Sequence, residues 1–440
     1  MADRSLKDDR LQRCFTAMRK AGKALIPIAA IILGAVSVIA PAAVEGSEFR
    51  VQPSILLSEE YNDNVLLTAK NRYDDYITRT APSLSVVYRA PNWEWNIAGN
   101  YNYLYYAKKT ISDDSYYTLD LTTKNRIVAD ILFLDVNDQY SRVSLDVTRD
   151  YTQESNFVNQ SDRNLLTINP YFVLKPFSHM TVTTGYIYMD TWYKDPLAID
   201  RTDHIGYTDV RQDLSPRSAM IAGVRHTLDI NTVEGYTQDD LYLGLYYEYA
   251  ENSTVTVKAG NSWFDFESKD RVSQVFWDAI LIKRYPTVTI TYETGLRFIP
   301  DPLLNLRRED RYLVTVRKDV ERFSLLVSGG LIEYREAEHK HLENTNYLLS
   351  GTISHNITTK SKFILDLAAE RLDDNQAGTS LETYRTGIRF EYLAMEKLTL
   401  AFDYRYTNVY SPDISSATYD NNRVTVELYG VELRKPWCTN

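Results

Sequence analysis

The chain has 440 residues, a net charge of −10 and 44% hydrophobic residues, a composition that excludes an intrinsically disordered protein. With only 17 Gly, 14 Pro and 2 Cys, it is neither collagen-like nor built on a disulfide framework. A mean hydropathy of −0.36 argues against a bundle of transmembrane helices. Tyr is abundant, at 34 residues, and this surplus needs a structural reason.

The first forty residues have the pattern of a secretory signal peptide. Basic residues between Arg13 and Lys23 precede an uncharged, mostly apolar run, Ala24 to Ile39, and small residues follow at Ala40 and Ala42. We predict that residues 1–42 are cleaved. A single membrane anchor is the alternative, but the run is shorter than the ~20 residues that cross a bilayer as a helix.

Cleavage at this point would change the charge of the protein. Residues 1–42 hold seven of the 49 basic side chains and three of the 59 acidic ones, so the mature chain carries a net charge of −14. This acidity argues against a nucleic-acid partner.

From residue 93 onward, side-chain character alternates with a period of two. Trp93, Trp95 and Ile97 fall on one face of an extended chain, while Glu94 and Asn96 fall on the other. The alternation predicts amphipathic strands, and it recurs at 241–249, 288–298, 384–392 and 398–406.

Turn signals separate these strands, and short turns alternate with longer polar loops. The short turns are expected near 90–92, 129–130, 175–178, 215–217, 251–253, 284–286, 319–322, 356–360 and 394–396. The longer loops are expected near 61–74, 108–114, 147–161, 195–203, 231–236, 267–270, 299–309, 336–342, 373–379 and 410–418. Together they imply about 20 strands, within a range of 18–22.

Three architectures use many amphipathic strands. Sandwich arrays would show linkers, and a propeller would repeat every ~40–50 residues; neither feature is visible. A transmembrane barrel predicts a signal peptide, alternating segments, and short turns alternating with long loops. We therefore predict an all-β protein in which residues 43–440 form one transmembrane antiparallel β-barrel, with short periplasmic turns, longer extracellular loops and a location in the bacterial outer membrane.

A membrane barrel would explain why Tyr is abundant. Tyr and Trp prefer the membrane interface, where the ring is apolar and its polar tip is wet. Tyrosines near the predicted strand ends are expected to form two girdles, although Tyr is also simply a good strand former. These residues are Tyr88, Tyr105, Tyr106, Tyr249, Tyr285, Tyr392, Tyr406 and Tyr410.

The sequence shows no pattern for catalysis. It contains no GxSxG, HExxH or phosphate-binding glycine loop, so we predict no enzyme activity and no cofactor. A hydrolase embedded in a barrel is the third alternative. His339 and His341 lie in a predicted loop that could bind a metal weakly, but a solvated loop explains them better, and we predict no metal site.

Charged residues fall on the face that would line the lumen. The candidates for the lumen and its selectivity are Arg297, Arg311, Arg317, Arg385, Arg389, Arg405, Glu293, Glu391 and Asp403. Rings of charge select solutes in pores. Alternatively, opposite charges pair across neighbouring strands and plug the lumen.

The loops and the C-terminus suggest partners. Acidic pairs such as Asp74-Asp75 and Asp373-Asp374 could bind cations that bridge to lipopolysaccharide, or could simply keep loops solvated. Outer-membrane barrels usually end in an aromatic residue that the barrel assembly machinery reads. Here Trp437 is followed by three more residues, which departs from that pattern.

The start of the predicted barrel resembles a known family. Residues 53–68, PSILLSEEYNDNVLLT, are followed by 74–79, DDYITR, and 82–84, PSL. These segments resemble the bacterial outer-membrane barrels associated with exopolysaccharide and PEP-CTERM systems, of the β-barrel porin type. The resemblance implies a location and a genetic context more than an activity.

Two functions follow as expectations. The first is a porin-like channel in contact with outer-membrane lipid, which exports or assists secretion of exopolysaccharide. The alternative is a non-conducting scaffold or surface receptor whose lumen is closed.

Overall fold

The computed structural model describes residues 47–267, 271–336 and 341–431. The predicted signal peptide, His339 and the C-terminal Trp437 lie outside these residues. No helix in the described ranges is long and apolar enough to cross a membrane.

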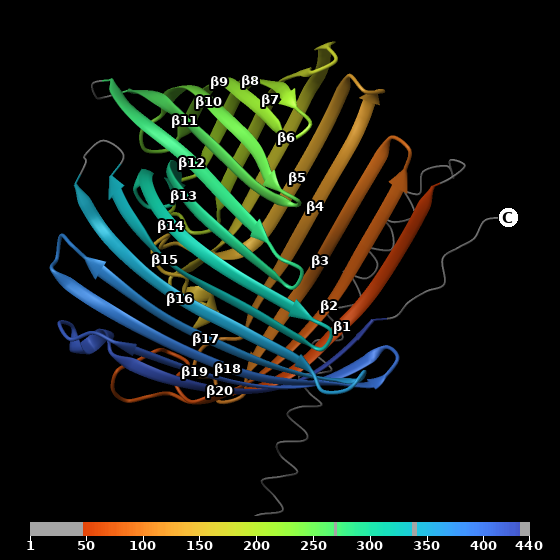
Figure 1. Cartoon of the computed structure of the whole chain (residues 1–440). Helices are drawn as coiled ribbons and strands as arrows, with labels where there is room; N and C mark the ends of the chain where they lie inside the picture. The colour runs from red at the N-terminus through yellow and green to blue at the C-terminus, as the bar shows by residue number, and fades with distance from the viewer. Residues whose placement is uncertain (1–46, 268–270, 337–340, 432–440) are drawn as a thin grey trace, which may run out of the picture.

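The described chain forms one closed antiparallel sheet of 20 strands (Figure 1). Consecutive strands pair with each other, and β1 pairs with β20 to close the barrel. The strands are β1 (Glu48–Asn62), β2 (Asp75–Ala90), β3 (Trp93–Tyr106), β4 (Asp114–Val128), β5 (Leu132–Ser144), β6 (Gln160–Phe177), β7 (Met180–Tyr193), β8 (Arg201–Ser215), β9 (Ser218–Asn231), β10 (Tyr236–Ala250), β11 (Ser253–Phe266), β12 (Val272–Arg284), β13 (Val288–Asp301), β14 (Asn305–Val320), β15 (Phe323–Glu336), β16 (Leu342–Asn356), β17 (Ser361–Asp374), β18 (Thr379–Met395), β19 (Leu398–Tyr410) and β20 (Tyr419–Val431). The predicted fold and strand number are confirmed.

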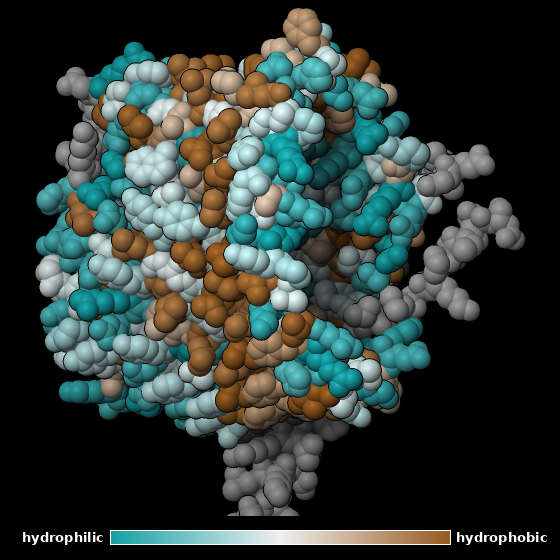
Figure 2. All heavy atoms as spheres, viewed as in Figure 1, coloured by the Kyte–Doolittle hydropathy of each residue, from teal (hydrophilic) through white to brown (hydrophobic). Residues whose placement is uncertain are grey.

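The period of two separates an outer face from an inner face. On β10, Leu241, Leu243 and Leu245 are 51%, 62% and 47% exposed, so their side chains point away from the barrel. Asp240 and Tyr242, which alternate with them, point inward. Figure 2 shows hydrophobic side chains gathered in a band across the strands, with hydrophilic residues on both sides of it. Such a band is the lipid-facing surface expected of a membrane barrel.

Short turns gather at one end of the barrel and the predicted longer loops at the other, as expected. Asp130 and Asn252 adopt positive φ angles of 61° and 53° in two short turns, a conformation that Asp and Asn tolerate better than most residues. We call the two ends the short-turn end and the long-loop end.

The tyrosine prediction holds at some positions and not at others, since Tyr88 and Tyr106 are both buried. Tyr285 and Tyr392, near the short-turn end, and Tyr410, at the long-loop end, are exposed on the outer face. Tyr106 is only 1% exposed and packs inside the barrel with Leu104, so it belongs to no girdle. It follows Tyr105 directly, and the pleat turns neighbouring side chains to opposite faces.

At two places neighbouring strands of the barrel wall part before their ends. Pairing of β12 with β13 ends at Trp277 and Leu296, although β13 and β14 stay paired as far as Asp301 and Asn305. Likewise, pairing of β4 with β5 ends at Leu119 and Tyr140, although β5 and β6 continue together. Beyond these points β13 is no longer held by β12, nor β5 by β4, while β14 stays paired with β15 as far as Arg307 and β6 stays paired with β7 as far as Arg163.

The tip of the β13–β14 hairpin folds into the barrel. Phe298 lies on the face of β13 that points outward lower down, yet its ring centroid is 4.6 Å from that of Phe264, on the inner face of β11. Leu306 joins the same buried cluster with Phe266 and Tyr236. The segment 299–309, predicted as a loop, is therefore mostly strand. Its prolines and consecutive charges hide the alternation that identifies the other strands.

Candidate functional site

The segment between β5 and β6, residues 145–159, crosses the barrel; we call it the crossing segment. The carbonyl oxygen of Val147 accepts a hydrogen bond from the Tyr334 hydroxyl of β15, at 3.3 Å. The carbonyl oxygen of Thr148 accepts one from the Asn346 amide of β16, at 3.1 Å. The predicted long loop at 147–161 exists, but it lies inside the lumen.

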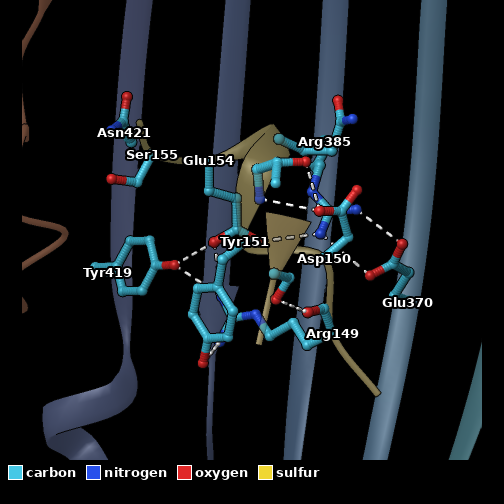
Figure 3. A network of polar contacts seen from close by, with 12 residues as sticks. Arg149, Asp150, Tyr151, Glu154, Ser155, Glu370, Arg385, Tyr419 and Asn421 are labelled. Atoms are coloured by element: carbon cyan, nitrogen blue, oxygen red, sulfur yellow. Dashed lines mark hydrogen bonds and ion pairs between the residues drawn. The ribbon is translucent and has the colours of Figure 1, made fainter. Parts of the chain in front are cut away.

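Glu154 fixes the far end of the crossing segment, and Figure 3 shows its partners on the opposite wall. Its side chain is fully buried, and its carboxylate accepts hydrogen bonds from Arg149 at 2.7 Å and from Arg385 of β18 at 2.9 Å. The Tyr419 hydroxyl of β20 donates to the same carboxylate. Arg385 also binds Glu370 of β17 at 2.8 Å. One carboxylate thus joins the segment to two strands.

This buried network balances its charges. Burial, the largest single cause, would lower the pKa of Arg149, but Glu154, Tyr419 and Tyr151 together outweigh it and raise the pKa. Two guanidinium groups, of Arg149 and Arg385, face two carboxylates, of Glu154 and Glu370. A buried ion pair is costly to break because one charge is left without a partner.

The return path of the crossing segment is held as well. Arg423 of β20 donates to the carbonyl oxygen of Gln153 at 2.5 Å. Further along, Phe157 packs against the buried cluster that contains Leu104 and Tyr106. The segment therefore contacts the wall on the far side of the lumen and again near its own base.

The crossing segment and the β13–β14 hairpin are linked through the β7–β8 loop. Leu145 packs with Tyr193 and Ala198. The neighbouring Ile199 donates its backbone N–H to the carbonyl oxygen of Pro302, at the hairpin tip, at 2.8 Å. Together these three elements obstruct the long-loop half of the lumen.

The nine predicted lumen residues lie on the inner face of the wall. On β18, for example, Tyr384, Ile388 and Phe390 are exposed outside, and Arg385 and Arg389 alternate with them. Each arginine makes an ion pair: Arg297 with Glu309 (2.8 Å), Arg311 with Glu293 (3.3 Å), Arg317 with Asp319 (2.6 Å), Arg385 with Glu370 (2.8 Å), Arg389 with Glu391 (2.8 Å) and Arg405 with Asp403 (2.9 Å).

Only some of these residues come together. Arg389 contacts Glu391, Asp403 at 3.7 Å and Glu427 at 2.7 Å, so it links Arg405 into one network through Asp403. Arg297 lies apart from this network, on the inward-folded hairpin. Their role in selecting a solute stays a prediction, while the pairing itself matches the alternative in which opposite charges neutralise each other.

The two halves of the lumen differ in exposure. The side chain of Arg317, toward the short-turn end of β14, is 65% exposed. That of Glu309, toward the long-loop end of the same strand, is 6% exposed. At the short-turn end a groove of about 500 Å³ reaches from Arg322 and Lys362 to Glu391. The short-turn end therefore holds a groove that is open to water, whereas the crossing segment, the β7–β8 loop and the hairpin tip lie in the long-loop half.

Two of the acidic pairs shape loops. Asp75 is completely buried and accepts the backbone N–H groups of Lys108 and Thr110. Asp374 accepts those of Gln376 and Ala377. These carboxylates stabilise turns, as Asp commonly does.

No family model matches the sequence, and no curated protein matches it. Solved structures do share its fold. The siderophore receptor PirA from Acinetobacter baumannii has a TM-score of 0.52 at 8% identity, covering 87% of this chain and 80% of that one. The FrpB iron transporter from Neisseria meningitidis (TM-score 0.49, 9% identity, 87% and 81% covered) and OpdO from Pseudomonas aeruginosa (0.41, 10%, 88% and 97%) are also similar.

The chain has the fold of an outer-membrane β-barrel. At these identities the likeness shows the fold alone. In such barrels short turns face the periplasm and longer loops face the outside. The obstructed half is therefore the extracellular half.

Proposed function

We propose that this protein is an outer-membrane channel that rests in a closed state. The observation that carries the proposal is the crossing segment, which is fixed to β15, β16, β18 and β20 across the lumen by specific contacts. A segment that only filled space would need no buried ion pairs. Attachment through side chains that can exchange partners suits an element that is held closed and can be released.

The open periplasmic half supports a channel. The exposed Arg317 and the groove near Arg322 and Lys362 form a charged, hydrated vestibule below the obstruction. Charged residues lining a wet lumen are typical of barrels that pass polar solutes. Exopolysaccharide as the solute is our finer proposal, and it rests on the sequence resemblance of residues 53–84.

Planar-bilayer recording tests the closed channel. The whole protein is compared with a variant in which residues 147–157 are replaced by a short Gly-Ser linker. We expect rare, small conductance from the whole protein and large, stable conductance from the variant. In the control, residues 375–377 of the β17–β18 loop become glycine, and conductance stays as in the whole protein.

Two results would overturn the proposal. Large, stable conductance from the unaltered protein would mean that the crossing segment does not close the lumen. Silence of a folded variant without the segment would favour the second candidate function, a non-conducting receptor or scaffold, which the same obstruction also fits. For the solute, loss of secreted polysaccharide on gene deletion, with small-solute uptake unchanged, is the expected result.

A further inference from the structure

Two buried carboxyl groups lie beneath the tip of the β13–β14 hairpin. Asp203 of β8 and Asp229 of β9 are directly opposite each other on the inner face, and they are 3% and 1% exposed. Two carboxylates side by side in a buried place repel each other, so one of them tends to keep a proton. No step described above uses this pair.

The hairpin tip rests on the pair through Arg201. One guanidinium nitrogen of Arg201 lies 3.5 Å from the carboxylate of Asp229, and another donates to the carbonyl oxygen of Asp301 at 3.3 Å. Asp301 is the last residue of β13, and it is itself 3% exposed. The backbone bond from Ile199 to Pro302 lies beside this contact. Arg201 therefore joins the wall to the hairpin.

The side chains around the pair include more carboxyl groups than guanidinium groups. From the hairpin, Arg307 binds Asp301 at 3.1 Å and approaches Glu343 of β16 at 3.7 Å. With Arg201, two guanidinium groups thus face four carboxyl groups. The other titratable groups that face this region are Tyr236 and Asp240 of β10, Tyr193 of β7 and Arg163 of β6. A proton on the pair reduces this imbalance.

We propose that one proton shared between Asp203 and Asp229 holds the tip of the β13–β14 hairpin, residues 299–306, in the extracellular mouth, and that loss of this proton to water releases the tip, while β14 stays paired with β15 from Arg307 onward. With both carboxylates charged, Asp203 and Asp229 repel each other while Arg201 can neutralise only one. Separation of the hairpin from the wall lets water reach both. This device adds regulation to the proposed closed channel.

The direction of the pH effect follows from the burial of two like charges side by side, which favours the protonated form of the pair. The docked state binds the proton more tightly than the released state, in which the carboxyl has its ordinary pKa of about 4. Docking is therefore strongest at low pH and weakens as the pH rises. The ratio of released to docked hairpin tip grows at most about tenfold per pH unit, and it levels off once the docked pair has lost its proton.

Spin labels measure docking directly. They are attached at two exposed positions, Leu197→Cys in the β7–β8 loop and Leu303→Cys at the hairpin tip, in a chain without Cys14 and Cys438. Distances are recorded on frozen samples at pH 5 and pH 8.5. We expect one short, narrow distance at pH 5, and at least a tenfold larger fraction of long distances at pH 8.5.

Asp203→Asn supplies the decisive variant, because its amide can donate to Asp229 without a proton. It should keep the short distance at both pH values, and Asp229→Asn should do the same. The control is Asp209→Asn, on the inner face of β8 beside Tyr242, which should follow the unaltered protein. Heat-dependent gel mobility identifies the folded barrels.

The same short distance at both pH values in the unaltered protein would overturn the proposal that the shared proton holds the hairpin tip. So would a pH response in Asp203→Asn and Asp229→Asn equal to that of the unaltered protein. The spin labels report docking whether or not the barrel conducts. Failure of the proton-dependent docking and failure of the proposed channel are therefore distinguishable.

Discussion

At the scale of single residues, Glu154 fixes the crossing segment to the far wall of the lumen. It lies in the crossing segment, and its partner Arg385 is 231 positions away in the sequence. The inward direction of Arg385 follows from the alternation along β18. No local pattern predicts Glu154, because a residue in an irregular segment has no periodicity and a contact over such a separation leaves no trace in one sequence.

Glu154→Gln should loosen the crossing segment. The substitution leaves Arg149 buried without its counter-charge, while Arg385 keeps Glu370, and breaking a buried pair of this kind costs about 3 kcal/mol. That energy corresponds to about a 100-fold larger released population. Trypsin cleavage at Arg149 should accelerate by a similar factor, since cleavage follows the open population.

A neighbouring substitution provides the control. Asp150→Asn alters an exposed cap whose carboxylate accepts the backbone N–H of Thr152, and it should cost about 1 kcal/mol or less. Cleavage as slow in Glu154→Gln as in the unaltered protein would show that the buried carboxylate does not hold the segment.

At the scale of elements, the sequence predicts most of the wall. In strands such as β10 and β18, apolar and polar side chains alternate because one face meets lipid and the other meets water. This pattern can be read from the sequence of each strand alone. The tip of the β13–β14 hairpin escapes prediction because its outer face packs against the inner face of β11. Phe298 and Leu306 therefore pack in a buried cluster, so they do not follow the alternation of strands that face lipid on one side.

Glycines on β15 give an element-scale prediction. A Cβ atom at Gly330 would lie 2.3 Å from the carbonyl oxygen of Tyr312, so the backbone of β14 or β15 must shift. Gly330→Ala should lower the free energy of unfolding by about 1–3 kcal/mol.

Gly329 is the matched control for Gly330. A Cβ atom there meets its nearest neighbour, in Leu349, at 3.5 Å, an ordinary contact. Gly329→Ala should change stability by less than about 0.5 kcal/mol. Reversible urea unfolding in detergent measures both variants, and equal stability of the two would contradict the packing described for this strand pair.

At the scale of the whole molecule, the open question was whether the lumen is open or filled. Composition cannot answer it, because the same inward arginines and acids suit a wet pore or a paired, filled interior. The answer lies in where the crossing segment and the hairpin go after leaving β5 and β13. Their courses are fixed by contacts with strands that are distant in the sequence.

A disulfide cross-link between the crossing segment and β16 tests this account most directly. Thr148→Cys is combined with Asn346→Cys, where the native backbone and side chain are 3.1 Å apart, in a chain without Cys14 and Cys438. The control pairs Thr148→Cys with Leu349→Cys, on the outer face of the same strand.

Under mild oxidation in intact outer membranes, we predict a cross-link in the first pair and none in the second, seen as altered gel mobility that a reductant reverses. Absence of the first cross-link in folded barrels would contradict a segment that lies across the lumen.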